Sequence, residues 1–301
     1  MLAAGRGIRL DPLTRIVAKP AVPIAGRTLI ELVLDRLVAQ GATDVVVNLH
    51  YLPHTITGVL GDGAHLGARV RYSWEQPVVL GSAGGPRRAL PLLDREHFVI
   101  VNGDTLPEVP LRDLVDAHRR SGAEATLAVI PNPAPDRYGG VVVNEDDAVT
   151  GFLPKGSAGN EWHFVGVQVA NASLFAPLED GVPVESVGQV YREAMAARPG
   201  SIRAWRTTGT FIDVGTPRDY FEAAHTLGGA TEQESIVWPG ASVDPGASLR
   251  RCIVASGVEV PRDFRADESI LLPASVAHEG DRCALRNAIA VFPIVPGARG
   301  L

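Results

Sequence analysis

The chain has 301 residues, of which 46% are hydrophobic and 21% are charged, and its formal net charge is −6. This length suits one large domain with a small one, and the composition is that of a globular protein with a hydrophobic core. The acidic balance argues against a nucleic-acid-binding protein, and no apolar run reaches the ~18 residues of a membrane span. Two cysteines without a C-x-x-C pair indicate a reducing compartment, and no signal peptide is recognisable, so we expect a cytoplasmic protein.

A glycine-rich segment at the start of the chain is suited to binding an anion. Its small or apolar residues are Leu2, Ala3, Ala4, Gly5 and Gly7. Glycines and small side chains let the backbone approach a ligand, and successive N–H groups can surround a phosphate. Arg9 adds a planar cation that matches phosphate oxygens, and Lys19, in a segment stiffened by prolines, is a second candidate cation for the same phosphates.

Helical and strand patterns alternate in the following part of the chain. Apolar residues at helical spacing predict helices over Thr28–Gln40 and Leu111–Ser121, each followed by a glycine. Short apolar or β-branched runs predict buried parallel strands at Asp44–Leu49, Arg69–Tyr72, His97–Val101 and Ala125–Ile130. This alternation predicts a doubly wound, Rossmann-like α/β domain with a mostly parallel sheet, in which ligands bind at the carboxyl ends of the strands.

The pattern changes near Gly228, where a repeat of six residues begins. Val237, Val243 and Leu249 are spaced by six, and Val254 and Val260 continue the interval after a slip of one. An aliphatic residue at this period, with turn-forming residues between, predicts a short left-handed β-helix of the hexapeptide-repeat kind. A proline- and glycine-rich loop is the alternative interpretation. We therefore expect two domains, residues 1–228 and residues 229–301.

The opening segment and the segment around Lys19 together resemble a known family signature. They read L-A-A-G-x-G-x-R-L-x-P-L-T and K-P-x-x-P-x-x-G, which is similar to the signature of the nucleotide-sugar pyrophosphorylases. The chain departs from the signature at Ala18, where the family usually has proline. The family also has residues before this motif that form a central strand, whereas this chain begins at Met1, so we expect a truncated or very short first strand.

The resemblance extends to a segment that reads the nucleotide base in the family. Residues 74–84, W-E-Q-P-V-V-L-G-S-A-G, are similar to the family's E-x-x-x-L-G-T-A-G. Gly81 carries over directly, and Ser82 stands where the family has threonine. One extra residue before the leucine leaves open whether Glu75 or Gln76 takes the polar role.

Two aspartates that follow predicted strands are candidate metal ligands. Asp104 lies in N-G-D after the strand His97–Val101, and Asp213 lies in F-I-D-V-G-T-P, which resembles the family's W-x-D-V-G-T-P. Carboxylates from two strands can hold one Mg²⁺, which prefers oxygen ligands and is shared with substrate phosphates. We therefore expect Mg²⁺ on Asp104 and Asp213.

The residues expected to bind the sugar phosphate also come from the resemblance. They are Asn102, Tyr138 and Gly139 in R-Y-G, Lys155 in F-L-P-K-G, and Gly166 in H-F-V-G-V. The family's F-x-E-K-P has a glutamate where this chain has Pro154, so one expected sugar contact is missing.

The resemblance implies transfer of a nucleoside monophosphate from a nucleoside triphosphate to a hexose 1-phosphate, with release of pyrophosphate. Arg9, Lys19, Asp104 and Asp213 would be the catalytic residues, and no general base is needed because the attacking phosphate is already anionic. The L-G-S-A-G segment with its C-terminal repeat most resembles mannose-1-phosphate guanylyltransferases, so GTP is favoured, with UTP or dTTP as alternatives. A homo-oligomer is expected, since such tails commonly build oligomers in the family.

Three other functions are compatible with parts of the sequence. A regulatory relative that binds substrates without turnover would fit the short start, Pro154 and Ser82, but Lys19, Asp104, Lys155 and Asp213 are all retained. A hexapeptide-repeat acyltransferase would need a longer β-helix. A metal-dependent glycosyltransferase would need a D-x-D motif, whereas the chain has N-G-D-T.

Overall fold

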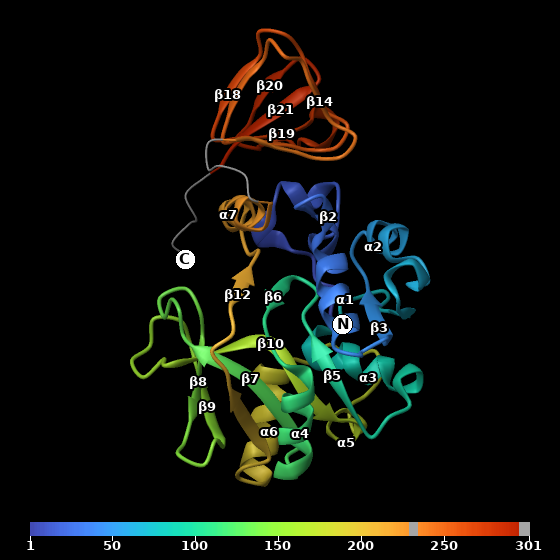
Figure 1. The fold of residues 1–301 in the computed structure, drawn as a ribbon, viewed down its shortest axis with the longest axis vertical. Coiled ribbons are helices and arrows are strands. Elements are labelled where there is room, and N and C mark those ends of the chain that lie inside the picture. The colour runs from blue at the N-terminus through green and yellow to red at the C-terminus, as the bar shows by residue number, and fades with distance from the viewer. Residues whose placement is uncertain (229–233, 295–301) are drawn as a thin grey trace. The chain divides into compact units, whose positions relative to one another are not determined.

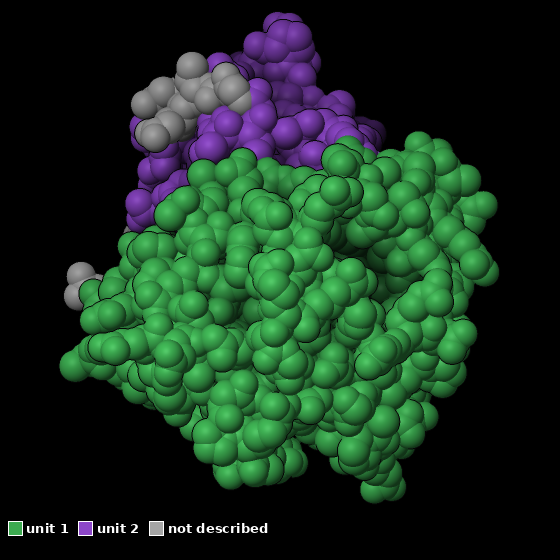
Figure 2. Space-filling model, turned by 60° about the horizontal axis from the view of Figure 1, so that its bottom comes forward, with its two compact units in different colours: residues 1–5, 33–53, 60–212 green, residues 6–32, 54–59, 213–301 purple. Residues whose placement is uncertain are grey.

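The computed structural model describes residues 1–228 and 234–294, which form two compact units (Figures 1 and 2). Unit 1 comprises Met1–Gly5, Val33–Pro53 and Leu60–Ile212, and unit 2 comprises Arg6–Leu32, His54–Val59 and Asp213–Leu301. The predicted domain boundary between residues 228 and 229 falls at the edge of 229–233, which lie outside the described residues. Within the described ranges, no helix combines the length and apolar character needed to cross a bilayer.

The predicted helices and strands of the first part of the chain are present. The two predicted helices are α1 (Leu29–Ala39) and α4 (Leu111–Ser121), and the predicted strands are β3 (Asp44–Leu49), β4 (Arg69–Trp74), β5 (His97–Val101) and β7 (Ala125–Pro131). A further helix, α3 (Gly81–Leu93), was not predicted. α4 ends at Gly122, which adopts a left-handed conformation with φ of 62°. Glycine tolerates this conformation without steric cost and therefore terminates the helix at the predicted position.

The α/β class is confirmed, and unit 1 contains a separate parallel pair of strands and a larger sheet of mixed direction. β3 pairs with β4 in parallel, and β7 pairs in parallel with β11 (Ile202–Arg206). The long strand β10 (Trp162–Asn171) pairs antiparallel with both β5 and β7. A buried apolar run does not encode its direction, so the sequence pattern could not show that β5 and β7 are joined through an antiparallel strand.

A hairpin precedes β10 and explains its direction. β8 (Gly140–Val143) pairs antiparallel with β9 (Val149–Leu153), and the order in this sheet is β11-β7-β10-β8-β9, with β5 also on β10. The start of the chain lies beside β5, where Leu2 forms a parallel bridge with Asn102, and the Leu2 amide donates to Val101 O at 2.8 Å. The carboxyl end of β5 and the glycine-rich start therefore meet at one edge.

One core holds the sheet of unit 1 together. α4 packs on β7, β10 and β11, and α6 (Tyr191–Ala197) packs on β9 and β11. Tyr191 is fully buried, and its hydroxyl donates to Gln168 at 2.6 Å, so its polar atom is satisfied within the core.

The remaining regular elements of the first 228 residues are η1 (Ile8–Leu10), η2 (Leu13–Arg15), η3 (Lys19–Ala21), β1 (Pro23–Ile24), β2 (Arg27–Thr28), α2 (Pro53–Leu60), η4 (Ala64–Leu66), β6 (Thr105–Pro107), α5 (Ala172–Phe175), the π-helix η5 (Ser186–Val190), β12 (Phe211–Asp213) and α7 (Pro217–Gly228).

In the C-terminal part of unit 2 the chain winds into successive turns of short parallel strands, which together form a coil. The strands are β13 (Ile236–Val237), β14 (Ser242–Val243), β15 (Ser248–Arg250), β16 (Ile253–Val254), β17 (Glu259–Val260), β18 (Arg265–Asp267) and β19 (Ser269–Pro273). They form three faces, β13-β16-β19, β14-β17 and β15-β18, in which paired residues such as Arg250 and Asp267 are 17 positions apart. This arrangement is consistent with the predicted β-helix, and its left-handed sense stays a prediction.

The slip in the six-residue repeat has a structural cause. Only residues 251 and 252 lie between β15 and β16, whereas four residues lie between β13 and β14 and between β14 and β15, and Arg251 turns the short corner with a positive φ of 53°. Glu268 occupies the equivalent corner of the next turn, also with positive φ, and accepts a bond from Arg251 at 3.2 Å. The coil then ends, because β21 (Ile289–Pro293) pairs antiparallel with β19 and with β20 (Ala284–Arg286). The predicted tail of 229–301 is thus a short coil closed by an antiparallel segment, and residues 295–301 lie outside the described residues.

Two contacts within unit 2 join this coil to the segments before it. The indole of Trp238, 1% exposed, donates to the hydroxyl of Tyr220 on α7, and that hydroxyl in turn donates to Pro23 O. Arg15, at the end of η2, binds Asp281 through both of its terminal nitrogens, at 2.5 and 2.9 Å. The Arg15 guanidinium also lies over the Phe292 ring, so one side chain holds two parts of the coil.

The Arg15–Asp281 pair predicts a specific dependence of stability on pH. Hydrogen bonds from Arg15 lower the pKa of Asp281 from 3.8 to about 2. A carboxyl group with a lowered pKa stabilises the folded state above its unfolded pKa, and this contribution is lost as the pH falls through the folded pKa. The thermal unfolding midpoint of Asp281→Asn should therefore lie below that of wild type at pH 6, and the difference should close between about pH 4 and pH 2. Asp263→Asn, an exposed aspartate of the same coil, is the matched control, and a difference that does not vary with pH would contradict the prediction.

Candidate nucleotide and sugar-phosphate site

The predicted phosphate-binding cations of unit 2 lie beside a predicted metal ligand. Lys19 is only 6% exposed, and its Nζ lies 4.0 Å from Asp213 Oδ1. Gly7 packs against the stem of Lys19, because a methyl group on Gly7 would lie 2.8 Å from Lys19 Cβ. Gly7 also has a φ of 63°, so both its conformation and its close approach require glycine. The glycine-rich segment and Lys19 are therefore one packed structure rather than two independent loops.

A second glycine, Gly215, marks the point where three charged groups converge. A methyl group on Gly215 would lie 2.9 Å from Asp213 Oδ2, 3.1 Å from Asp219 Oδ2 and 3.3 Å from Arg9 Nη1. Asp219 is 9% exposed and lies in the first turn of α7, where its amide donates to Thr216 Oγ1. Asp219 was not predicted from the sequence, although an acidic residue soon after D-V-G-T-P, in the first turn of a helix, is a signal that indicates it.

In the predicted base-reading segment of unit 1, Glu75 and Gln76 differ in their exposure to solvent. Glu75 has no exposed surface, and its two carboxylate oxygens accept bonds from Asn48 Nδ2 and from the Leu80 amide, both at 2.7 Å. Gln76, by contrast, is exposed. Burial raises the pKa of Glu75, against the lowering effect of these hydrogen bonds. Of the two alternatives left open by the sequence, Gln76 is the one accessible to a ligand.

The neighbouring positions Gly81 and Ser82 are tied to a distant segment. Gly81 has a φ of 77°, and a methyl group there would lie 2.7 Å from both Glu185 Oε1 and Val184 O. The Ser82 hydroxyl donates to Glu185 Oε2 at 2.5 Å and accepts a bond from the Ser186 amide at 2.8 Å. The Ser82 side chain therefore orients the start of α3 through its bonds to the beginning of η5.

On the sugar side, Gly166 and Asn102 lie against each other. Gly166 sits in an irregularity of β10 between Phe164 and Gln168, with a φ of 80°. A methyl group on Gly166 would lie 2.6 Å from the side-chain Nδ2 of Asn102, and the main-chain N–H of Asn102 donates to Gly166 O at 2.9 Å. The bulge thus presents the Gly166 backbone beside the carboxyl end of β5.

The other predicted sugar-phosphate residues are more exposed. Tyr138 is half-buried and lies 4.6 Å from His163 and 5.8 Å from Phe211, measured between ring centroids. The next residue, Gly139, is exposed, and its carbonyl bonds the His163 ring nitrogen at 3.2 Å. Lys155 lies exposed in a turn after β9. The aromatic cluster was not expected from the sequence, because its members come from three separate segments.

The predicted metal pair is divided between the units, since Asp104 belongs to unit 1 and Asp213 to unit 2. Among the described residues, no group of three or more His, Cys, Asp or Glu side chains could hold a metal ion. Mg²⁺ is commonly held by one or two carboxylates together with substrate phosphates, so a complete protein cage is not required. The carboxylates that converge at Gly215 are the hard oxygen donors that such an ion needs, and the pairing of Asp104 with Asp213 stays a prediction.

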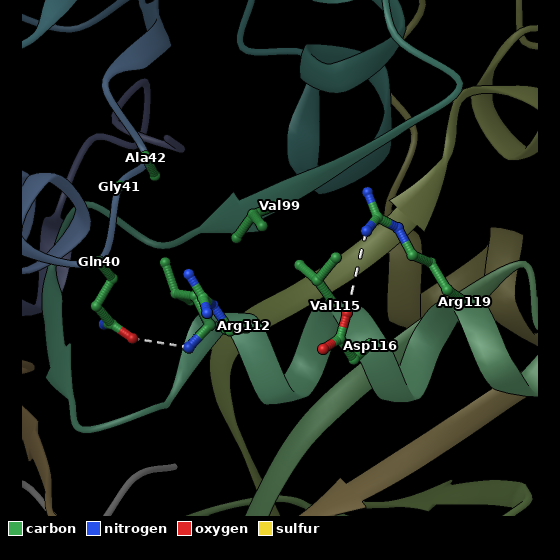
Figure 3. A pocket seen from close by; sticks show the side chains of 9 residues that line it. Gln40, Gly41, Ala42, Val99, Arg112, Val115, Asp116 and Arg119 are labelled. Atoms are coloured by element: carbon green, nitrogen blue, oxygen red, sulfur yellow. Dashed lines mark hydrogen bonds and ion pairs between the residues drawn. The ribbon is translucent and has the colours of Figure 1, made fainter.

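A cavity of about 470 Å³ in unit 1 contains none of the predicted site residues (Figure 3). It is lined by residues 40–42, which follow α1, by Val99 of β5, and by Arg112, Asp116 and Arg119 of α4. Arg119 lies 4.0 Å from Asp116, so its charge is partly neutralised within the cavity wall. This cavity of unit 1 is therefore separate from the predicted substrate-binding residues.

Comparison with known proteins places the chain in a family. The model of the nucleotidyl transferase family matches residues 1–228, and the chain belongs to this family. N-acetylmuramate alpha-1-phosphate uridylyltransferase of Neisseria meningitidis is 35% identical, over 72% of this chain and 92% of that protein. Mannose-1-phosphate guanylyltransferase of Mycobacterium tuberculosis is 29% identical, over 90% of this chain and 78% of that protein.

The fold is also that of solved structures. HddC from Yersinia pseudotuberculosis aligns with a TM-score of 0.66 and 22% identity, over 75% of this chain and 97% of HddC. A second structure of HddC is complexed with GMP-PN. The similarity supports the α/β architecture described above.

The close contact between Gly166 and Asn102 predicts that a methyl group added at Gly166 destabilises the folded protein. Gly166→Ala should lower the free energy of unfolding by about 1–3 kcal/mol, because it combines positive-φ strain with a collision. Urea unfolding monitored by circular dichroism measures the change. Gly58→Ala in α2 is the matched control: no described atom lies within 4 Å of the added methyl, so stability should stay equal or rise by up to about 1 kcal/mol. Equal stability of the two variants would contradict the prediction.

Proposed function

We propose that this protein is a sugar-1-phosphate nucleotidyltransferase, which forms a nucleoside diphosphate sugar and pyrophosphate from a nucleoside triphosphate and a sugar 1-phosphate. The observation that carries the proposal is the gathering of Arg9, Lys19 and Asp213 in one unit, in a chain of the nucleotidyl transferase family. Two cations beside a carboxylate suit a polyphosphate that arrives with a divalent ion. Membership of the family and the names of both relatives support the same reaction.

The proposed reaction is an in-line displacement at phosphorus. An oxygen of the sugar 1-phosphate attacks the α-phosphorus, the bond from that phosphorus to the bridging oxygen breaks, and pyrophosphate leaves with that electron pair. Arg9 and Lys19 bind the triphosphate and offset the charge on the departing pyrophosphate. Lys155 holds the sugar phosphate against repulsion from the other phosphates. Mg²⁺, held by Asp104 and Asp213, would supply further charge neutralisation when bound.

The substrate pair proposed first is GTP with mannose 1-phosphate. The guanylyltransferase of M. tuberculosis matches 90% of this chain, a larger share than the 72% matched by the uridylyltransferase. UTP with N-acetylmuramate 1-phosphate is the second candidate, favoured by the higher identity of 35%. A cytoplasmic location and a homo-oligomeric state remain predictions from the sequence.

Pyrophosphate release tests the proposed activity. Purified protein with Mg²⁺, one nucleoside triphosphate and one sugar 1-phosphate should release pyrophosphate for one preferred pair. Asp104→Asn and Asp213→Asn should each lower kcat/KM by about 100-fold or more, because each removes a charge that stabilises the transition state. EDTA should abolish release, and added Mg²⁺ should restore it. Asp113→Asn, an exposed aspartate of α4, is the control and should retain activity. A folded wild-type protein that is inactive with every pair would support the regulatory alternative instead.

The two lysines predict different kinetic defects. Lys19→Met should raise KM for the nucleoside triphosphate and lower kcat, together by about 100-fold or more in kcat/KM, because a buried cation beside Asp213 is lost. Lys155→Met should mainly raise KM for the sugar 1-phosphate, by about tenfold or more, since this lysine is proposed to bind only that substrate. Initial rates with each substrate varied separately measure both effects. If Lys155→Met changed neither constant, its proposed role would be wrong.

A further inference from the structure

Four segments of unit 1 meet at one buried hydrogen-bonded pair, Asn48 and Glu75. Asn48, near the end of β3, is 6% exposed, and its Oδ1 accepts a bond from the Ala3 amide at 2.6 Å. Its Nδ2 donates to Glu75 Oε1 at 2.7 Å, and Glu75 Oε2 accepts a bond from the Leu80 amide at 2.7 Å. A single chain of bonds therefore runs from Ala3, in the glycine-rich start, to Leu80, at the start of α3.

The environment of the pair leaves no room for another arrangement. A methyl group on Gly85 of α3 would lie 2.6 Å from Glu75 Oε1 and 2.8 Å from Asn48 Nδ2, so α3 packs directly on the pair. The ring nitrogen of His50 bonds the main-chain carbonyl of Glu75 at 2.8 Å. A carboxylate buried in this way is tolerated only because donors are provided to both of its oxygens.

One end of this chain of bonds is a predicted nucleotide-binding residue, and the other end directly precedes one. Ala3 belongs to the segment expected to surround the phosphates, and Leu80 precedes Gly81, which is expected to contact the base. We propose that Asn48 and Glu75 are positioning residues of the nucleotide site, because together they hold these two backbone segments at one spacing and so set the affinity for the nucleoside triphosphate. The inference rests on the proposed function, adds Asn48 to the site, and gives Glu75 a positioning role in place of direct contact with the base.

The polarity of the bonds allows an exchange test. In Asn48→Asp, the new carboxylate faces the carboxylate of Glu75, so neither group donates a hydrogen bond to the other. In Glu75→Gln, one position that held a carboxylate oxygen holds an NH₂ group, which faces a donor, either Asn48 Nδ2 or the Leu80 N–H. Each single variant therefore leaves one mismatch. In the double variant N48D/E75Q, the carboxylate introduced at position 48 can accept from both the Ala3 N–H and the amide introduced at position 75, and the oxygen of that amide accepts from the Leu80 N–H. Every bond of the original chain is then restored with the roles of the two side chains exchanged.

Steady-state kinetics of wild type and these three variants test the proposal. Each single variant should raise KM for the nucleoside triphosphate about tenfold or more, while KM for the sugar 1-phosphate stays within about threefold of wild type. The double variant should return KM for the nucleotide to within about threefold of wild type. Asn48→Ser, which adds no charge and is too short to bridge both partners, replaces Asn48→Asp if that variant does not fold.

Asn171→Asp is the matched control. Asn171 Nδ2 also donates to a glutamate, Glu124 Oε2 at 3.3 Å, but in a network with His118 that contains none of the predicted nucleotide-binding residues. This control should lower the unfolding midpoint without raising KM for the nucleotide. Single variants that lose stability but keep the wild-type KM would overturn the proposal, as would a folded double variant no better than the worse single one. Wild type is assayed first: inactivity there would overturn the proposed function, whereas activity with unaffected variants would overturn only this inference.

Discussion

A buried ammonium group beside a carboxylate, Lys19 beside Asp213, is the interaction on which the proposed phosphate site depends. Removing either charge from water is costly unless a partner of opposite sign is present, so the two segments that carry them must stay together in the folded chain. Lys19 lies on η3 and Asp213 ends β12, far apart in sequence. A larger side chain at Gly7 would displace the stem of Lys19, and one at Gly215 would displace the carboxylate of Asp213. The glycines of this region therefore serve the placement of charge as much as the approach of a ligand.

Unit 1 uses the same principle with hydrogen bonds in place of ion pairs. Glu75 is buried with donors on both oxygens, and Gly166 lets Asn102 pack directly on the β10 backbone. These contacts fix main-chain segments before any substrate binds. Binding groups that are already oriented need little reorganisation when charge develops in a reaction, which is the general advantage of a rigid site. The predicted binding positions Gly81 and Gly166 thus lie on tightly packed backbone, whereas Lys155 lies exposed in a turn.

The C-terminal coil contributes to the same constraint within unit 2. Arg15 directly follows the predicted phosphate segment, and it binds Asp281 while stacking on Phe292. Tyr220 and Trp238 make a second connection from α7, the helix that begins just after Asp213 and Gly215. The coil therefore supports both halves of the charged cluster at Arg9, Lys19 and Asp213, in addition to any role in assembly.

The sequence by itself determined the local elements and the family, because both depend on residue order over short distances. The bounds of β3, β5 and α4 follow from apolar runs and a terminating glycine, and the motifs around Gly5, Lys19 and Asp213 indicate the nucleotidyl transferase family that the comparison confirms. Only the tertiary structure decided which of two adjacent polar residues is accessible, with Glu75 buried and Gln76 exposed, because burial depends on what packs against a side chain. The antiparallel direction of β10, the approach of Asp219 to Arg9 and the short corner at Arg251 have the same origin. Each depends on contacts between residues distant in the chain, which no local pattern records.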